Sequence, residues 1–453
     1  MIEIALLLGI LFALFCGICA VAHSLRVKRM TLLDWSLLAV GGMYGLGWVL
    51  VLLATQAGNN PLWEVWITPF PSLYPMHTAA AFLLVVGVLG GWYVPSSALP
   101  LRRAQELSTR SPAARSWAFA FWMMLTVAVL LQGIYTRAYG GYLGLLEYSA
   151  LIRSGLFDAV PANSWSFLRP FGGLAMIAAY GFFGLRLSGC RGISASLGLV
   201  IALVFSLYIL YSWLGRMGFL VFVATFILGV ILVRGSSPAR VILWGSAVFV
   251  LLLVSAYGVS LWLNLKAASS LLEFLARELS FPFVSFFAQW NHGEHLSRGF
   301  IDFLLSPIYL LPSSWWTSWF DPVGQVNTAL IMGAPKGEDG VTGAIPVDLL
   351  TLGLMQAHLF GVFVVGSMFG LLLRGLQVLI DRVPLCGVRG ILEAHVALKV
   401  AVLGAFYAEP HLVVSGNFPL IAGTLIIVAM LGLRKARLQS LFPNQKSTMG
   451  NHS

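Results

Sequence analysis

Charged residues are scarce in this chain. Only 10% of its 453 residues are Asp, Glu, Lys or Arg, whereas 59% are apolar. An average soluble domain carries roughly a quarter charged residues, so these side chains are too few to cover a soluble protein of this length. The composition therefore predicts an integral membrane protein.

Cysteines and known catalytic signatures are also scarce. Cys16 and Cys19, two of only four cysteines, are spaced as C-x-x-C, but they lie in an apolar run without the βαβ context of a redox motif. We expect no disulfide, no metal site and no other cofactor. No Walker motif, kinase signature or G-x-S-x-G elbow occurs. A reaction would have to use membrane-derived or extracytoplasmic substrates without ATP.

The apolar residues gather into long runs. A helix needs about 20 such residues to span a bilayer. We find eleven runs, near residues 2–24, 33–55, 74–94, 117–135, 168–187, 194–213, 216–233, 241–262, 351–373, 391–408 and 413–433. The sequence thus predicts an all-α polytopic membrane protein with about 11 (11–12) transmembrane helices.

Basic residues orient these helices. One set of loops, together with the C-terminal tail, holds 18 of the 27 Lys and Arg residues, and the opposite side holds eight. The positive-inside rule places the richer side in the cytoplasm, with the N-terminus outside and the C-terminus inside. The net charge of +10 therefore reflects topology, and we expect no nucleic-acid partner.

Loop lengths divide the chain into regions. Residues 1–262 form an eight-helix membrane region with an outer loop at 136–167. Residues 263–350 form a large outer loop, rich in aromatic residues, with re-entrant or interfacial helices. Three C-terminal transmembrane helices (351–433) and a cytoplasmic tail (434–453) follow. Because long loops in compact proteins are usually functional or disordered, and disordered segments lack aromatics, we expect a folded, functional loop.

Cations on the outer side are candidate ligands for a pyrophosphate group. Arginine binds phosphate bidentately and keeps its charge, and the positive-inside rule disfavours cations on this side. The alternatives are a snorkelling side chain, an ion pair with Glu147 or Asp158, or a solvent-exposed turn. The candidates are Arg137, Arg153, Arg169, Arg216 and Lys336.

Three further residues are candidates for catalysis. Glu409 and His411 stand in a very short outer connection, where poor hydration would shift their pKa values toward use as an acid or base. The alternative is an ion pair that closes a helical hairpin. Arg277 is the third candidate, although Glu273, four residues earlier on the same helix face, could neutralise it.

Two other histidine pairs carry weaker signals. His292 and His295 are three residues apart beside a glutamate, but the sequence offers no third well-spaced metal ligand, which favours an ordinary loop. His395 and Lys399 are four residues apart near the cytoplasmic end of the tenth run. We interpret them as a buried polar pair.

The chain resembles the Wzy-type O-antigen polymerases, also described as oligosaccharide repeat-unit polymerases. Many spans, two sizeable outer loops and the position of the larger loop before the last few spans carry the architectural part of the resemblance. The local part covers residues 263–433, with a weaker similarity at 139–175. Its motifs are RELSFP at 277–282, LLP at 310–312, GQVNT at 324–328, GVTG at 340–343, the small-residue-rich helix at 352–366 and AEP at 408–410.

The resemblance implies a GT-C-like architecture and a glycosyltransferase in the bacterial inner membrane. Such an enzyme joins oligosaccharide repeat units carried on undecaprenyl pyrophosphate at the periplasmic face. Arg216, Arg169 and Arg277 would stabilise the departing pyrophosphate, and Glu409 or His411 would take the acceptor proton. The implied partners are lipid-linked oligosaccharides, membrane lipids, and a chain-length regulator and a flippase of the same pathway.

Two other functions compete with polymerisation. An O-antigen ligase, which transfers finished polymer to lipid A–core, would want a functional histidine in the large loop, for which His292 or His295 could serve. A lipid-linked oligosaccharide flippase or transporter predicts internal repeats and charges along a central cavity, and no repeat occurs here. A structural scaffold is disfavoured by the outer arginines.

Overall fold

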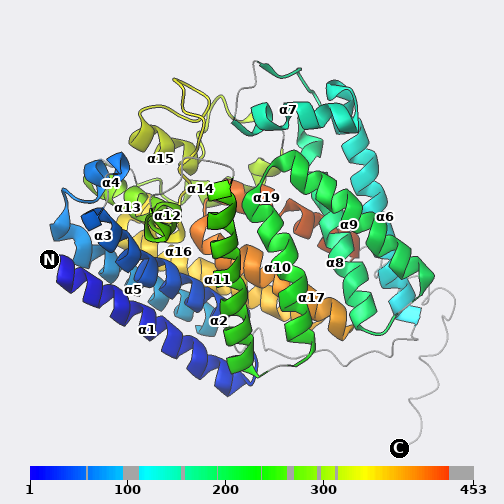
Figure 1. Cartoon of the computed structure of the whole chain (residues 1–453), viewed down its shortest axis with the longest axis horizontal. Helices are drawn as coiled ribbons and strands as arrows, with labels where there is room; N and C mark the ends of the chain where they lie inside the picture. Colours follow the sequence, from blue (N-terminus) through cyan, green and yellow to red (C-terminus); the bar gives the residue numbers. More distant parts are fainter. Residues whose placement is uncertain are drawn as a thin grey trace, which may run out of the picture.

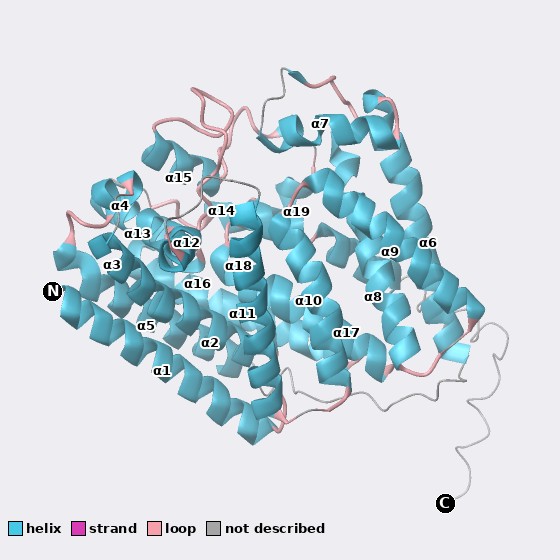
Figure 2. Ribbon diagram, in the orientation of Figure 1, coloured by secondary structure: helices cyan, strands magenta, loops and turns pink. Residues whose placement is uncertain are grey.

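All regular elements in the described part of the protein are helices (Figure 2). This confirms the all-α prediction. The computed structural model describes residues 1–57, 60–94, 112–154, 159–190, 192–235, 237–262, 270–292, 297–311 and 315–427.

The helices follow one another closely along the chain (Figure 1). The first part contains α1 (Ile2–Val27), α2 (Leu32–Val40), the π-helix η1 (Gly41–Gly47), α3 (Trp48–Ala57), α4 (Pro61–Trp66), η2 (Pro71–Leu73), α5 (Tyr74–Tyr93), α6 (Pro112–Thr136), η4 (Arg137–Tyr139), α7 (Tyr142–Ser154), η6 (Ser166–Gly173) and α8 (Leu174–Leu187). The second part contains α9 (Ile193–Trp213), α10 (Arg216–Val233), α11 (Pro238–Trp262), α12 (Leu271–Leu279), α13 (Phe281–His292), α14 (Ile301–Leu304), η7 (Ser306–Leu310), α15 (Val323–Met332), α16 (Leu349–Asp381), α17 (Cys386–Val396), the π-helix η9 (Ala397–Val402), α18 (Leu403–Phe406) and α19 (Pro410–Gly416).

Seven helices in the described residues are long and apolar enough to cross a membrane. They match the predicted runs that begin near residues 2, 33, 74, 117, 168, 194 and 351. The run at 413–433 corresponds to a pair of helices, Pro410–Gly416 and Phe418–Ile427, bent by 48° and able to form an eighth span. The run at 216–233 is the shorter helix α10, and the run at 241–262 lies within α11. The run at 391–408 overlaps the consecutive elements α17, η9 and α18, the last of which ends at Phe406. The structure thus shows a multi-pass membrane protein.

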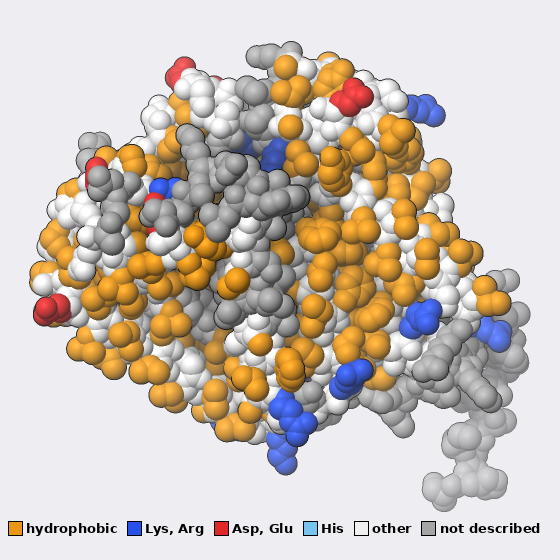
Figure 3. Space-filling model, in the orientation of Figure 1, with side chains coloured by type: hydrophobic (Ala, Val, Ile, Leu, Met, Phe, Trp, Pro, Cys, Tyr) orange, Lys and Arg blue, Asp and Glu red, His pale blue; other side chains and the backbone are white. Residues whose placement is uncertain are grey.

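Several positively charged side chains lie at one end of the bundle. In the view of Figure 3, apolar side chains cover the middle of the molecule and several Lys and Arg side chains lie along its lower edge. The opposite end carries α7 and α15 (Figure 1). We call this end the outer side, because the positive-inside rule predicts that it faces away from the cytoplasm.

Small residues allow α5 and α16 to pack closely. Gly87 and Gly91 on α5 face Gly366 and Gly370 on α16, so each helix carries glycines spaced as G-x-x-x-G. A Cβ atom at Gly366 would lie only 2.6 Å from the backbone oxygen of Leu84. Since lipid tails are as apolar as helix surfaces, membrane helices associate through such close van der Waals packing.

Helix α16 is broken near its outer end. Ala357 and His358 have non-helical backbone angles, and the φ of His358 is 54°. The break exposes backbone carbonyls, which would be costly inside a membrane without hydrogen-bond donors. The segment before α14 supplies these donors. Arg298 N–H donates to Met355 O over 3.0 Å, and Gly299 N–H donates to Gln356 O over 3.0 Å.

Candidate functional site

Three of the predicted phosphate-binding cations lie together on the outer side. The Lys336 ammonium donates a hydrogen bond of 2.7 Å to the backbone oxygen of Arg153. Burial lowers the pKa of Lys336, and the positive charges of Arg153 and Arg169 lower it further. Arg153 lies on α7, Arg169 lies in η6 and Lys336 follows α15, so the fold brings distant segments together. We call these three residues the basic cluster.

The basic cluster has no carboxylate partner among the residues that the structure describes. Arg153, Arg169 and Lys336 form no ion pair among the residues that the structure describes; the ion pairs found there are His23–Asp34, Arg29–Asp381, Arg277–Glu273 and Arg298–Asp302. Arg153 instead donates to the backbone oxygen of Leu214, two residues before α10 begins. Like charges repel, so their accumulation favours a site that an anion completes.

The remaining predicted cations differ in their surroundings. Arg216 is the first residue of α10, close in sequence to the Leu214 carbonyl that contacts Arg153, but its side chain lies outside the described part. Arg137 is exposed in η4, with no side-chain partner in the described residues. Arg277 is paired with Glu273 on α12, which packs against α3 and η1. The neutralising partner considered for Arg277 is therefore present.

The predicted carboxylate Glu409 is buried. Its side chain is 5% exposed, and it stands directly before Pro410, the first residue of α19. Burial raises the pKa of Glu409 to about 7, the backbone N–H of Gly324 acts in the opposite direction by donating to the carboxylate, and the nearby Asp302 raises the value further. Near neutral pH this group can therefore both hold and release a proton, which is the property that a general base needs.

Gly324 makes this arrangement possible. A Cβ atom at residue 324 would lie 2.6 Å from Cδ and 2.8 Å from Oε1 of Glu409. No side chain fits between the N-terminal end of α15 and the carboxylate. Because α15 belongs to the large outer loop, Gly324 couples this loop to the short connection that carries Glu409.

His411, on the same connection as Glu409, packs among aromatic rings of the large outer loop. Its ring centroid is 5.1 Å from that of Tyr309 and 5.8 Å from that of Trp316, both in edge-to-face contact. Within the described residues, Glu409 and His411 form no ion pair. Burial raises the pKa of Tyr309, and the carboxylates of Asp302 and Glu409 raise it further, whereas Arg298 acts in the opposite direction.

A second buried carboxylate supports this region. Asp302 is fully buried and accepts hydrogen bonds from Arg298 Nε at 2.6 Å, from an Arg298 terminal nitrogen at 3.0 Å and from Gln356 Nε2 at 2.8 Å. Arg298 also lies over the ring of Phe320. Gln356 is the last helical residue before the break in α16, so this network fixes the broken helix to the large loop.

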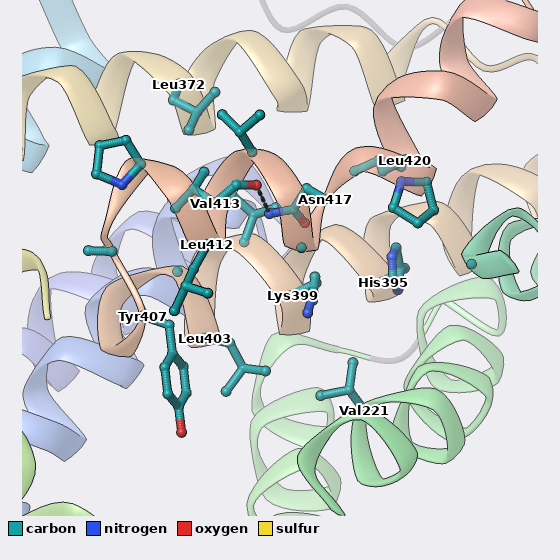
Figure 4. A pocket seen from close by; sticks show the side chains of 18 of the residues that line it. Val221, Leu372, His395, Lys399, Leu403, Tyr407, Leu412, Val413, Asn417 and Leu420 are labelled. Carbon is teal, nitrogen blue, oxygen red and sulfur yellow. Dashed lines mark hydrogen bonds between the residues drawn. The ribbon is translucent and has the colours of Figure 1, made fainter. Parts of the chain in front are cut away.

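A cavity extends into the membrane region beside Glu409. Its volume is about 550 Å³, within the range of small-molecule sites. Ala408 and Pro410, the two neighbours of Glu409, lie in its wall, as do Gly173 at the end of η6 and Met217 at the start of α10. The cavity therefore reaches from the Glu409 connection to the helix ends near Arg169 and Arg216. Figure 4 shows part of its lining.

The comparisons with known proteins add no relative. No family model, no curated protein and no solved structure matches this chain.

Sequence reasoning missed several residues around Glu409. Arg298 and Asp302 are four apart, a spacing that could have indicated their ion pair. Gly324 and Gln356 carry no comparable local signal, because their roles depend on partners more than 50 residues away. His292 and His295, the histidines considered for a ligase, lie outside the described side chains.

Proposed function

We propose that this chain is an oligosaccharide polymerase, a glycosyltransferase that uses a lipid-pyrophosphate donor. It would join oligosaccharide repeat units linked to undecaprenyl pyrophosphate into O-antigen or a related surface polysaccharide, at the periplasmic face of a bacterial inner membrane. The lipid donor and the direction of transfer follow from the resemblance to Wzy-type polymerases.

The basic cluster is the observation that carries this proposal. Arg153, Arg169 and Lys336 come from three separate segments, both arginines lie within electrostatic reach of Lys336, and none of the three has a carboxylate partner among the described residues. A pyrophosphate carries several negative charges and would be stabilised there as it leaves. Charges that are already positioned stabilise a developing anion without reorganisation during the reaction.

Glu409 supplies the complementary chemistry. The acceptor sugar hydroxyl attacks the anomeric carbon of the donor, and a new carbon–oxygen bond forms as the bond to the pyrophosphate oxygen breaks. The hydroxyl proton passes to the Glu409 carboxylate, and the pyrophosphate departs with its lipid. A pKa of about 7 lets Glu409 accept this proton at neutral pH and release it before the next cycle.

Deletion of the gene tests the proposed function. We expect the surface polysaccharide of the deletion strain, separated on a gel, to retain one repeat unit on its core and to lose the ladder of longer products. Loss of every unit, including the single one, would instead indicate a ligase or a flippase. An unchanged ladder would refute the proposal.

Variants of the basic cluster test the site. Arg153→Ala, Arg169→Ala and Lys336→Met should each shorten or abolish the ladder at normal protein levels. Arg234→Ala is the matched control, because it removes an exposed positive charge directly after α10 at the opposite end of this helix. An intact ladder in all three cluster variants would remove the cluster from the mechanism.

A further inference from the structure

The membrane cavity contains a group of polar side chains that sugar transfer does not use. Its lining is mostly apolar, yet Lys399, His395 and Asn417 also belong to it. In Figure 4, Lys399 and His395 project from the same helix side by side, and Asn417 lies on the neighbouring segment. Val221 of α10 lies in the opposite wall.

The ring of His395 packs against Tyr180 at 4.8 Å between centroids, but hydrogen-bond partners are missing for these polar groups within the described structure. His395 Nδ1 and Asn417 Oδ1 are buried without a hydrogen bond, and Lys399 takes part in no ion pair or hydrogen bond there. Asn417 donates to Val413 O over 2.8 Å, which leaves its oxygen free to accept. Buried polar atoms are almost always hydrogen-bonded, so two such unpartnered atoms beside the Lys399 ammonium in one cavity indicate a missing ligand.

The backbone at Lys399 is also unusual. Lys399 lies in η9, where the helix is wound as a π-helix between α17 and α18. Short π-helical segments cost stability and occur frequently at functional sites. The π-helix provides an observation that is independent of the missing partners.

The arrangement does not fit a simple buried pair. The positive charge of Lys399 disfavours a positive charge on His395, and Lys399 donates no hydrogen bond to His395 Nδ1. Ionisable side chains inside a membrane are expensive and normally point to a partner or a substrate pathway. A partner for this group has to be an anion with hydrogen-bonding oxygens.

We propose that Lys399, His395 and Asn417 bind the phosphate of a single-chain phosphomonoester amphiphile inside this cavity. The Lys399 ammonium pairs with a phosphate oxygen, the His395 Nδ1–H donates to a second oxygen, and the Asn417 oxygen accepts the remaining P–OH proton. A monoprotonated phosphate carries one negative charge, which Lys399 balances. The apolar walls hold the hydrocarbon chain, and a cavity of about 550 Å³ has room for one such chain. This inference does not rest on the proposed function, since it concerns binding alone.

Lipid binding to the purified full-length protein tests the proposal. Native mass spectrometry would compare hexadecyl phosphate with hexadecanol, and dioleoyl phosphatidic acid would distinguish a two-chain phospholipid from a single-chain source. We expect hexadecyl phosphate to bind at least about tenfold more tightly than the alcohol, as a charge-assisted hydrogen-bond set requires. Lys399→Met should abolish this preference. Lys336→Met, in the basic cluster, should retain it.

A second variant probes the hydrogen-bond pattern. Hexadecyl sulfate carries one negative charge but no acidic proton at neutral pH. The native protein should therefore prefer hexadecyl phosphate, and Asn417→Leu should remove this discrimination while binding both anions. Without ligand, Lys399→Met should unfold at the same temperature as the native protein or at a higher one. If Lys399 served only to stabilise the fold, the variant would unfold at a lower temperature.

Two outcomes would overturn the proposal. One is equal binding of hexadecyl phosphate and hexadecanol by the native protein. The other is a preference that survives in Lys399→Met but disappears in Lys336→Met, which would place the phosphate at the basic cluster. Tighter binding of phosphatidic acid than of hexadecyl phosphate would refute the single-chain assignment.

Discussion

Gly324→Ala offers a sharp test of the role assigned to Glu409. The new methyl group would lie 2.6 Å from Cδ and 2.8 Å from Oε1 of Glu409, closer than side-chain carbons pack. The carboxylate would have to move, and it would lose the hydrogen bond from the Gly324 N–H. This bond lowers the pKa of Glu409, so its loss should raise a pKa that is already about 7.

The size of the effect follows from the energy of this bond. A hydrogen bond to a charged group contributes about 1.5–3 kcal/mol, and one pKa unit corresponds to about 1.4 kcal/mol, so the pKa should rise by about one to two units. A base works only when it is deprotonated. At pH 7 the deprotonated fraction should fall from about one half to between about 10% and 1%, so the rate should fall about 5- to 50-fold.

The assay is the initial rate of polymer formation from a lipid-linked oligosaccharide, measured between pH 5.5 and 9.5. The native rate should fall as the pH decreases through about 7, and the midpoint for Gly324→Ala should lie about one to two units higher. Gly343→Ala is the matched control, because a Cβ atom at that loop position meets open space. A folded Gly324→Ala protein with an unshifted midpoint would refute the role of Glu409 as the base.

Three further predictions concern the same region. Glu409→Gln should lower the rate about 10²- to 10⁴-fold with little change in thermal unfolding, and a rate near the native value would exclude general-base catalysis by this residue. Arg169→Ala should raise KM for the lipid-linked donor or lower kcat by about 10- to 150-fold, the value of a lost charged hydrogen bond, in a steady-state assay in which Arg234→Ala behaves as the native protein. Arg298→Met should destabilise the protein by about 3–5 kcal/mol, because it leaves the buried Asp302 without its cation; denaturant unfolding measures this, and a loss below about 1 kcal/mol would contradict the account.

The amino-acid sequence is sufficient to predict the class of the protein and the location of most helices. Apolar runs of about 20 residues cannot be accommodated in water, and their positions predict seven helices that the structure contains. The run at 391–408 shows the limit of this reasoning. It overlaps α17, η9 and α18, where the side chains of His395 and Lys399 interrupt the apolar pattern.

The sequence also identified individual members of the candidate site. Arg153, Arg169 and Lys336 stood out because the positive-inside rule disfavours cations on the outer side, and Glu409 stood out because its connection is very short. The sequence could not show whether each residue was paired. Arg277, singled out by the same rule, is paired with Glu273 on its own helix.

Which of these residues come into contact depends on the three-dimensional fold. Lys336 reaches Arg153 across 183 residues of chain, and Gly324 donates to Glu409 from another segment of the fold. Such proximity depends on helix packing, including the glycine contact between α5 and α16, and on the break that lets the segment 297–299 bind α16. Long-range contacts leave no periodic signal in a single chain. The sequence therefore shows where charged residues interrupt apolar segments, and the fold determines which groups surround each of them.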